Sequence, residues 1–407
     1  MYDSAAAVLT LLRDADVYAP EPLGRRDLVI AGGEIIAIGA PGERLAAAYG
    51  AREVDARGQR VIPGLIDAHV HVTGGGGESG FASRVPPILL GALARAGITT
   101  VVGTLGTDGT TRTIEDLVAR TYGLREEGLS AYCYTGSYQT PPRTLTGSVR
   151  GDIVFVEPII GVGELAISDH RSSQPTFDEL VRVAADCHVA GLTTGKAGIL
   201  HLHLGDGPRG LALVRRAVTE TELPARVFQP THINRNFRLF AEAIAIATEL
   251  GVPVDVTAFP ADADSYDAAE AIARCLAAPG FPTARLTCSS DGAGCLPVFD
   301  ADGRLTSMDV GRPESLASAL RDLLVRGLAL ATVLPVFTAN VAAALRLARK
   351  GHLAVGADAD LVILDEHHHV TSVMARGRWL VRDGIQVAFG TFERPAPSRS
   401  VEKGLTS

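Results

Sequence analysis

The chain has 407 residues, 46% of them hydrophobic, and a formal net charge of −8. This length accommodates a large domain together with a smaller one, and the apolar content excludes a chain that is disordered throughout. The negative charge and the few basic clusters argue against a nucleic-acid partner. Because no run of about 18 apolar residues occurs, we expect no membrane span, and we expect no secretory signal.

The cysteines indicate the compartment. Five of them are scattered along the chain without a C-x-x-C pair, which favours reduced thiols and a cytoplasmic location over a disulfide framework. They are Cys133, Cys187, Cys275, Cys288 and Cys295.

Both ends of the chain carry short strand patterns separated by turn residues such as Gly32-Gly33. We expect the two ends, residues 1–61 and 347–394, to form one small β-sandwich domain, and residues 395–407 to form a disordered tail. The predicted strands are Val8–Leu12, Asp27–Ala31, Glu34–Gly39 and Glu53–Asp55 near the start, and Ala359–Leu364, Val370–Ala375 and Arg378–Val381 near the end.

The middle of the chain, residues 62–346, alternates apolar strand-like runs with helical patterns, which predicts a parallel α/β architecture. The clearest helix begins at Thr176, with Glu179 completing a capping box, and Gly191 is expected to end it. Eight runs with crossover helices fit a closed (β/α)8 barrel better than an open sheet. The runs are 61–71, 98–105, 130–137, 153–167, 198–204, 226–232, 252–258 and 284–290.

The first of these runs ends in His69 and His71. Residues two apart on a strand point to the same side, so both imidazoles face one place. In a parallel barrel this end of the strands is where active sites are built. A pair of histidines at this position is therefore a candidate metal site, although such a pair alone also occurs on strands that bind no metal.

Other polar residues close later strands in the same way. Histidines 201 and 203 end the fifth run, His232 ends the sixth, and Asp291 follows the eighth. Singly, a histidine here is a satisfied polar residue and Asp291-Gly292 is a turn. Together they converge on one mouth, where imidazole and carboxylate suit Zn²⁺. The run His367–His369 is expected to be a surface cluster.

The segment from Pro63 to His71 resembles the first-strand signature of the amidohydrolase superfamily, and Gly351–Val362 resembles its second-domain signature. Within that superfamily, motifs in order after successive strands are similar to those of the isoaspartyl dipeptidase family. These motifs are Gly74–Glu78, Leu105–Asp108, Gly136–Tyr138, Ala166–Arg171 and Thr231–Asn236. Because Gly205-Asp206 also matches a His-x-Gly-Asp segment of the family, His203 is preferred as a ligand and His201 is expected to pack one layer deeper.

The resemblance implies a binuclear enzyme that cleaves the β-linked amide of isoaspartyl dipeptides with a hydroxide that bridges two divalent metals, zinc being the expected ion. Two such metals lower the pKa of a shared water and polarise an amide, and arginine forks grip carboxylates. A homo-oligomer is expected. The resemblance implies that His69, His71 and Asp291 hold one zinc, that His203 and His232 hold the other, and that Asp291 transfers the proton. It also implies that Glu78 recognises the substrate amine and that Tyr138 donates a hydrogen bond to the scissile carbonyl. Arg171 and Arg235, near Gly76 and Thr107, would recognise the substrate carboxylates.

The sequence departs from the family pattern at two positions. Where the family has a carbamylated lysine bridging the metals, this chain has Glu164. A glutamate is shorter but is also a bidentate anion, so we expect it to bridge the metals; the alternative is loss of one metal or of activity. Cys295 replaces a serine near the substrate carboxylate, and a thiol is a weaker hydrogen-bond donor.

Two other functions stay open from the sequence. One is a different amidohydrolase activity, such as a cyclic amidase or an N-acyl-amino-acid deacylase, whose substrates lack the free amine that Glu78 would bind. The other is a non-catalytic barrel that serves as a scaffold, which metal content would distinguish.

Overall fold

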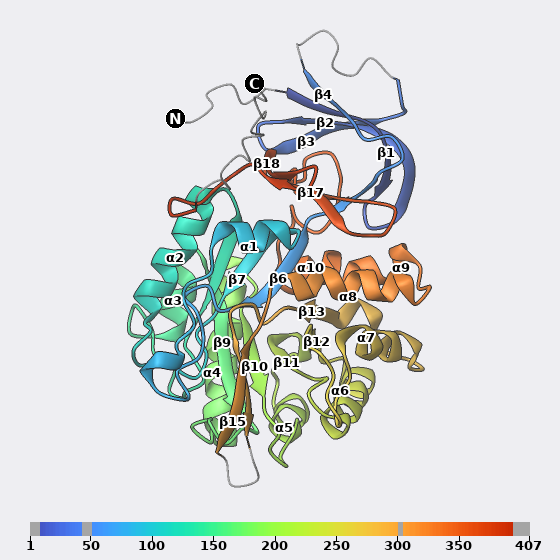
Figure 1. The fold of residues 1–407 in the computed structure, drawn as a ribbon. Coiled ribbons are helices and arrows are strands. Elements are labelled where there is room, and N and C mark those ends of the chain that lie inside the picture. Colours follow the sequence, from blue (N-terminus) through green and yellow to red (C-terminus); the bar gives the residue numbers. More distant parts are fainter. Residues whose placement is uncertain (1–8, 43–50, 300–303, 394–407) are drawn as a thin grey trace, which may run out of the picture.

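The computed structural model describes residues 9–42, 51–299 and 304–393. Eight strands from the middle of the chain close into the predicted (β/α)8 barrel (Figure 1). Strands β6 to β11 form one parallel sheet, and β12 pairs in parallel with β13. The backbone N–H of His71, directly after β6, donates to the carbonyl of Gly292, shortly after β13, at 2.9 Å. This hydrogen bond connects the first strand of the barrel with the last. The strands are β6 (Leu65–Val70), β7 (Ile98–Gly103), β8 (Ser130–Thr135), β9 (Ile159–Ile167), β10 (Ile199–Leu204), β11 (Phe228–Thr231), β12 (Val254–Thr257) and β13 (Leu286–Ser289).

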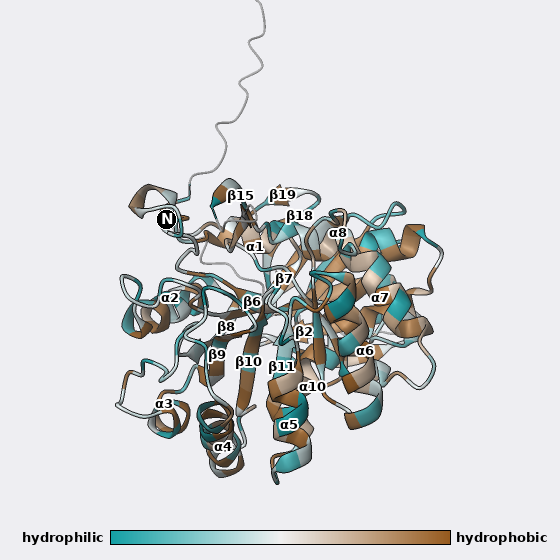
Figure 2. Ribbon diagram, turned by 90° about the horizontal axis from the view of Figure 1, so that it is seen from below, coloured by the Kyte–Doolittle hydropathy of each residue, from teal (hydrophilic) through white to brown (hydrophobic). Residues whose placement is uncertain are grey.

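Helices surround these strands (Figure 2). Burial on both faces explains why the barrel strands are apolar almost throughout. The α-helices are α1 (Leu90–Arg95), α2 (Ile114–Glu127), α3 (Val149–Phe155), α4 (Phe177–Thr194), α5 (Ala212–Glu220), α6 (Phe237–Leu250), α7 (Ala268–Ala277), α8 (Glu314–Val325), α9 (Leu330–Val333) and α10 (Ala339–Ala344); short 3₁₀ turns are η2 (Phe81–Ser83), η3 (Ala225–Val227), η4 (Thr283–Arg285) and η5 (Leu334–Phe337).

Helix α4 tests the predicted start and end signals. The capping box of Thr176 and Glu179 is present. The prediction that Gly191 ends the helix is wrong, because the helix continues to Thr194 and Gly195 caps it. Gly195 has φ 77°, the left-handed conformation that stops a helix.

The two chain ends form the predicted small β domain, whose strands make one continuous nine-stranded sheet above the barrel (Figure 1). Leu12, Val61, Ile363 and Met374 pack in its core. Its path runs β19-β18-β17-β16-β5-β1-β2-β3, and β4 pairs with β1. The strands are β1 (Leu9–Tyr18), β2 (Pro22–Ala31), β3 (Glu34–Gly39), β4 (Arg52–Asp55), β5 (Arg60–Pro63), β16 (Leu361–Leu364), β17 (Val370–Ala375), β18 (Arg378–Arg382) and β19 (Ile385–Gln386).

The run predicted as a single barrel strand over 61–71 is divided at Gly64. Its first part, β5, pairs with β16 and β1 in the small domain, and only β6 enters the barrel. Residues 62 and 63 thus belong to the outer sheet, which extends two residues beyond the predicted boundary at 61. The other domain boundaries stay predictions, and both Val8 and the predicted tail at 395–407 lie outside the described residues.

A hairpin that the sequence did not predict follows the last barrel strand. It consists of β14 (Cys295–Phe299) and β15 (Leu305–Val310), which pair antiparallel. None of the positions in β15 is fully buried, so the hairpin lacks the apolar pattern by which strands are found.

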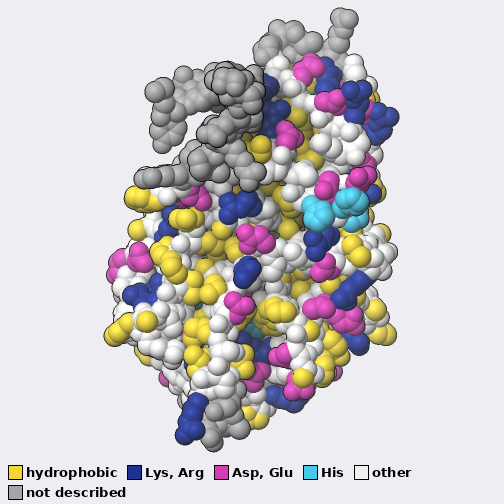
Figure 3. Space-filling view, in the orientation of Figure 1, with side chains coloured by type: hydrophobic (Ala, Val, Ile, Leu, Met, Phe, Trp, Pro, Cys, Tyr) yellow, Lys and Arg dark blue, Asp and Glu magenta, His cyan; other side chains and the backbone are white. Residues whose placement is uncertain are grey.

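The surface carries mixed charges. On the face in Figure 3, acidic and basic side chains are interspersed. His367 and His369 are 74% and 52% exposed, as predicted for a surface cluster. His368 is half-buried, and its Nδ1 lies 3.0 Å from Nη1 of Arg60. Among the described residues, none of the helices has the length and apolar character required to cross a membrane.

Candidate metal centre and substrate cavity

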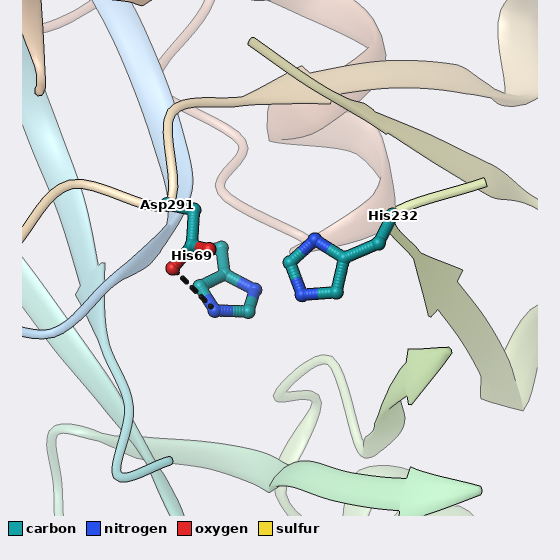
Figure 4. Close-up of side chains that lie close together, drawn as sticks. All are labelled: His69, His232 and Asp291. Atoms are coloured by element: carbon teal, nitrogen blue, oxygen red, sulfur yellow. Dashed lines mark ion pairs between the residues drawn. The ribbon is translucent and has the colours of Figure 1, made fainter. Parts of the chain in front are cut away.

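The barrel brings the six predicted metal ligands together at the carboxyl ends of its strands. His69 is the last residue but one of β6 and His71 directly follows the strand. Glu164 lies in β9, His203 in β10, His232 directly after β11, and Asp291 two residues after β13. All six are buried. Their ligand atoms form three overlapping groups, each within 4.8 Å: His69, His232 and Asp291; His69, His71 and Glu164; and Glu164, His203 and His232. Figure 4 shows the first of these groups.

Glu164 lies between two pairs of histidines. Its Oε1 is 3.4 Å from the Nε2 atoms of both His69 and His71. Its Oε2 is 3.1 Å from Nδ1 of His203 and 3.5 Å from Nε2 of His232. Each oxygen therefore faces a different pair of imidazoles, which is the arrangement that a carboxylate bridging two cations requires.

A β-bulge in β9 positions Glu164. Leu200 pairs with Val162 and Leu202 with Leu165, so His201 alone opposes both Gly163 and Glu164. Such a bulge re-aims a side chain. A Cβ on Gly163 would lie 2.9 Å from Cβ of His201 and 3.0 Å from the ring of Tyr134. The bulge therefore needs glycine beside the glutamate.

Asp291 completes the cluster from the opposite side. Its Oδ1 is 3.1 Å from Nε2 of His71 and 3.5 Å from Nε2 of His69. Burial favours the neutral acid, but the hydrogen bond to His71 and the histidine charges outweigh it and lower the pKa of Asp291 to about 2. Asp291 and His232 have φ of 53° and 61°, a strained conformation typical of functional sites.

This donor set fits divalent cations. Four imidazoles and two carboxylates, shielded from water, match the nitrogen and oxygen ligands of zinc and similar ions. Isolated charges of this kind are costly to bury unless they are paired or coordinate metals.

His201 has a role that sequence reasoning missed. Its ring stacks on Tyr134, with centroids 5.1 Å apart, as expected for a packing residue. However, its Nε2 also lies 2.8 Å from Nδ1 of His69. Partners of this type fix the tautomer of a metal-binding histidine. The sequence placed His201 on the same face of its strand as His203, which was the only signal for such a role. It did not reveal the partner, because His69 lies in β6, far away in the sequence.

A cavity next to the metal cluster is lined by every residue predicted to bind substrate. These are Gly76, Glu78, Thr107, Tyr138, Arg171, Arg235 and Cys295. They come from loops after β6, β7, β8, β9 and β11 and from the start of β14.

Glu78 has one occupied and one open carboxylate oxygen. Its Oε1 accepts a hydrogen bond from Thr107 at 2.9 Å and lies 3.5 Å from Nη1 of Arg171. Its Oε2 is buried and has no hydrogen-bond partner among the described residues. A buried acceptor without a partner is costly, so this oxygen is suited to a donor supplied by a ligand.

Arg112, which the sequence analysis did not single out, holds the glycine-rich loop that carries Glu78. Its guanidinium donates to the carbonyls of Thr73, Gly75 and Val85. A Cβ on Gly76 would lie 2.4 Å from the carbonyl oxygen of Ser83. The glycines therefore allow the loop to fold tightly on itself, and Arg112 cross-links it; no local pattern reveals this.

Tyr138 and Cys295 are both protonated groups. Burial raises the pKa of Tyr138 well above its usual value, so the phenol keeps the proton it needs to donate. Its oxygen is 2.8 Å from Nδ1 of His203. Burial, together with the charge of Glu78, raises the pKa of Cys295 to about 12.

Comparison with known proteins shows the family. The sequence matches the amidohydrolase family over residues 60–380. The fold is similar to that of the β-aspartyl dipeptidase from Fervidobacterium islandicum AW-1 in complex with the β-Asp-Leu dipeptide, with 40% sequence identity, TM-score 0.89, and coverage of 95% of this chain and 100% of that chain. A second structure of the enzyme from that organism gives 39% identity, TM-score 0.87 and the same coverage.

More distant relatives share the fold alone. The dihydropyrimidinase from Brevibacillus agri NCHU1002 is 18% identical, with TM-score 0.64, and 95% of this chain and 100% of that chain are covered. Because the family match spans most of the chain and the predicted metal ligands converge at the mouth of the barrel, this protein is a metal-dependent hydrolase and belongs to the amidohydrolase family.

Proposed function

We propose that this protein hydrolyses the β-linked amide of β-aspartyl (isoaspartyl) dipeptides. The observation that carries the proposal is the charge pattern of the cavity: beside the metal cluster lie a carboxylate with an open, buried oxygen, Glu78, and two arginines, Arg171 and Arg235. A β-aspartyl dipeptide has one ammonium and two carboxylates, so each charge has a partner. The relative with 40% identity is a β-aspartyl dipeptidase bound to β-Asp-Leu.

We infer two divalent ions, zinc being the expected metal, bridged by Glu164 in place of a carbamylated lysine. His69, His71 and Asp291 would hold one ion, and His203 and His232 the other. The two oxygens of Glu164, each facing one histidine pair, support the bridge. When bound, such ions activate water and polarise the scissile carbonyl.

The residues of the chain do the rest. Glu78 pairs with the substrate ammonium, beside Thr107, and the arginines orient the carboxylates near Gly76 and Cys295. Tyr138 donates a hydrogen bond to the carbonyl oxygen. Asp291, ionised at neutral pH, accepts the proton of the attacking water and passes it to the leaving amine.

The test is a comparison of substrates. We expect hydrolysis of β-aspartyl-leucine that a chelator abolishes, far slower cleavage of α-aspartyl-leucine, because reaction requires close positioning, and no cleavage of N-acetylated β-aspartyl-leucine. Preference for a cyclic amide or an N-acyl amino acid would instead assign one of the other amidohydrolase activities. Metal content without any hydrolase activity would favour a scaffold.

We also infer a cytoplasmic location and a homo-oligomer. All five cysteines are free, as expected in a reducing compartment. Light scattering coupled to size-exclusion chromatography tests the assembly.

A further inference from the structure

Asp169 lies two residues beyond the end of β9 and is only 5% exposed. Its carboxylate contacts two parts of the site. On one side, Oδ2 is 2.9 Å from Nε2 of His203. On the other, the guanidinium of Arg171 donates from Nε to Oδ1 at 3.0 Å and from Nη2 to Oδ2 at 2.7 Å, and Nη1 of Arg235 lies 3.8 Å from Oδ2.

The contact with His203 determines what the other ring nitrogen can do. Nδ1 of His203 faces Glu164 at 3.1 Å, inside the metal cluster. If Nε2 carries the proton and donates it to Asp169, the lone pair of Nδ1 is available to a cation. A carboxylate that accepts from the far nitrogen of a histidine fixes both its tautomer and its orientation.

The contact with Asp169 orients the guanidinium of Arg171, which lines the substrate cavity. Two parallel hydrogen bonds between a guanidinium and a carboxylate define the plane of the arginine. The same guanidinium reaches Glu78 at 3.5 Å, so Asp169 holds it at the cavity.

The packing leaves Asp169 little freedom. A Cβ on Gly205 would lie 2.5 Å from Cβ and 2.6 Å from Oδ2 of Asp169. Glycine at 205, directly after β10, is therefore needed for the carboxylate to lie against His203.

We propose that Asp169 is a positioning residue that supports metal binding and carboxylate recognition at the same time, by fixing the ring of His203 and the guanidinium of Arg171. The carboxylate half of this inference rests on the proposed function, whereas the metal half does not.

The experiment compares substitutions at three positions in the full chain. Asp169→Asn keeps the size of the side chain but not its charge, so it cannot serve both neighbours as an acceptor. Arg235→Met removes a substrate arginine that does not contact His203. Asp206→Asn is the matched control, because Asp206 is a 70% exposed acid, 3.8 Å from Arg235, and is not among the described residues that line the cavity. Zinc release to a chelator and KM for β-aspartyl-leucine are measured for each.

For Asp169→Asn we expect zinc release from one of the two sites to be about 10–100-fold faster and KM to rise about ten-fold or more. Arg235→Met should raise KM with zinc release close to wild type, and Asp206→Asn should change neither. Asp169→Glu, which retains the charge, should recover part of both losses if the carboxylate itself is responsible.

Two results would overturn the proposal: wild-type zinc release in Asp169→Asn, or accelerated release with an unchanged KM. Circular dichroism and thermal melting identify a variant that fails to fold, in which case Asp169→Glu decides: a change in both zinc release and KM supports the proposal, and a change in only one of them, or in neither, overturns it. If the wild-type protein does not cleave β-aspartyl-leucine, the proposed function fails, and zinc release together with calorimetric binding of L-aspartate still tests the role of Asp169.

Discussion

Buried acids in this barrel differ in their partners. Asp67 accepts hydrogen bonds from the hydroxyl and the backbone N–H of Ser290, and burial raises the pKa of this carboxyl to about 7. Glu164 is equally buried, but the charges of His69 and His203 outweigh burial and lower its pKa well below the usual value. Glu164 is therefore the acid that stays charged at the centre of the histidine cluster.

Glu164→Gln should reduce the metal content from about two ions per chain, because a neutral amide bridges two cations poorly. Elemental analysis measures this loss. Reconstitution of the wild-type protein should not need bicarbonate, because no carbamate has to form. Among the described residues, Lys196 donates to the carbonyls of Ile153, Val156 and Ile159, so it is not available as a bridge. Activation that depends on bicarbonate would contradict the prediction.

Glu78→Gln should lower kcat/KM for β-aspartyl-leucine, and the loss should correspond to about 2–4 kcal/mol of activation free energy, because the substrate ammonium loses its charged partner. Steady-state kinetics test this. Glu366→Gln is the control, since Glu366 is 87% exposed on the outer domain and should leave kinetics unchanged. Equal effects of the two substitutions would count against the assignment of Glu78.

Affinity for zinc should rise with pH. In the metal-free protein burial lowers the pKa of His71, but hydrogen bonds to Asp291 and Glu164 outweigh it and raise the pKa to about 10. Below that pH a cation must displace a proton from the ring. Affinity should therefore increase up to about ten-fold per pH unit for each proton displaced, as measured by chelator competition. A flat profile from neutral to mildly alkaline pH would refute this prediction.

At the scale of elements, the bulge in β9 decides where the bridging carboxylate points. The strand as such would alternate side chains between the barrel interior and the helices. The extra residue shifts that alternation beside His201, so Glu164 faces the histidines.

Gly163→Ala should destabilise the fold by about 1–3 kcal/mol through overpacking against His201 and Tyr134, and should also lower zinc content by moving Glu164. Denaturant unfolding and elemental analysis measure the two effects. Gly123→Ala in α2 is the control: its Cβ would meet only Arg120, at 3.6 Å, and helix propensity predicts a gain of about 0.5–1 kcal/mol. Unchanged stability in Gly163→Ala would show that the bulge relaxes.

At the scale of the molecule, a buried lysine joins the barrel to the outer sheet. Nζ of Lys350 donates to Oγ of Ser130, at the start of β8, at 2.6 Å. It also contacts Asp360 at 2.5 Å and Asp358 at 2.7 Å, just before β16. These contacts tie the C-terminal part of the outer domain to the wall of the barrel.

Lys350→Met should cost about 3–5 kcal/mol of unfolding free energy, because it leaves the buried carboxylate of Asp360 without its charged partner. Arg349→Met is the matched control: Arg349 pairs with Asp358 but is 51% exposed, so its loss should cost at most about 1 kcal/mol. Chemical denaturation compares the two. Similar costs would show that burial of Lys350 contributes little.

Much of this protein follows from local patterns in its sequence. The alternation of apolar runs with helices predicts the barrel, because each run must be buried on both faces. The spacing of His69 and His71 places both on one side of a strand, and the carboxyl ends of parallel strands meet at one mouth. The ligand set and the cavity residues were predicted through these positions and the resemblance they support.

Only the tertiary structure decided which atoms face each other. The bulge beside Gly163, the hydrogen bond between His69 and His201, 132 residues apart, and the clamp of Arg112 on the glycine-rich loop all depend on the register between distant segments. Division of the first run at Gly64 likewise depends on which sheet offers β5 a partner. Side-chain periodicity is a property of one segment, whereas these contacts depend on how strands far apart in sequence align, and no single segment specifies that alignment.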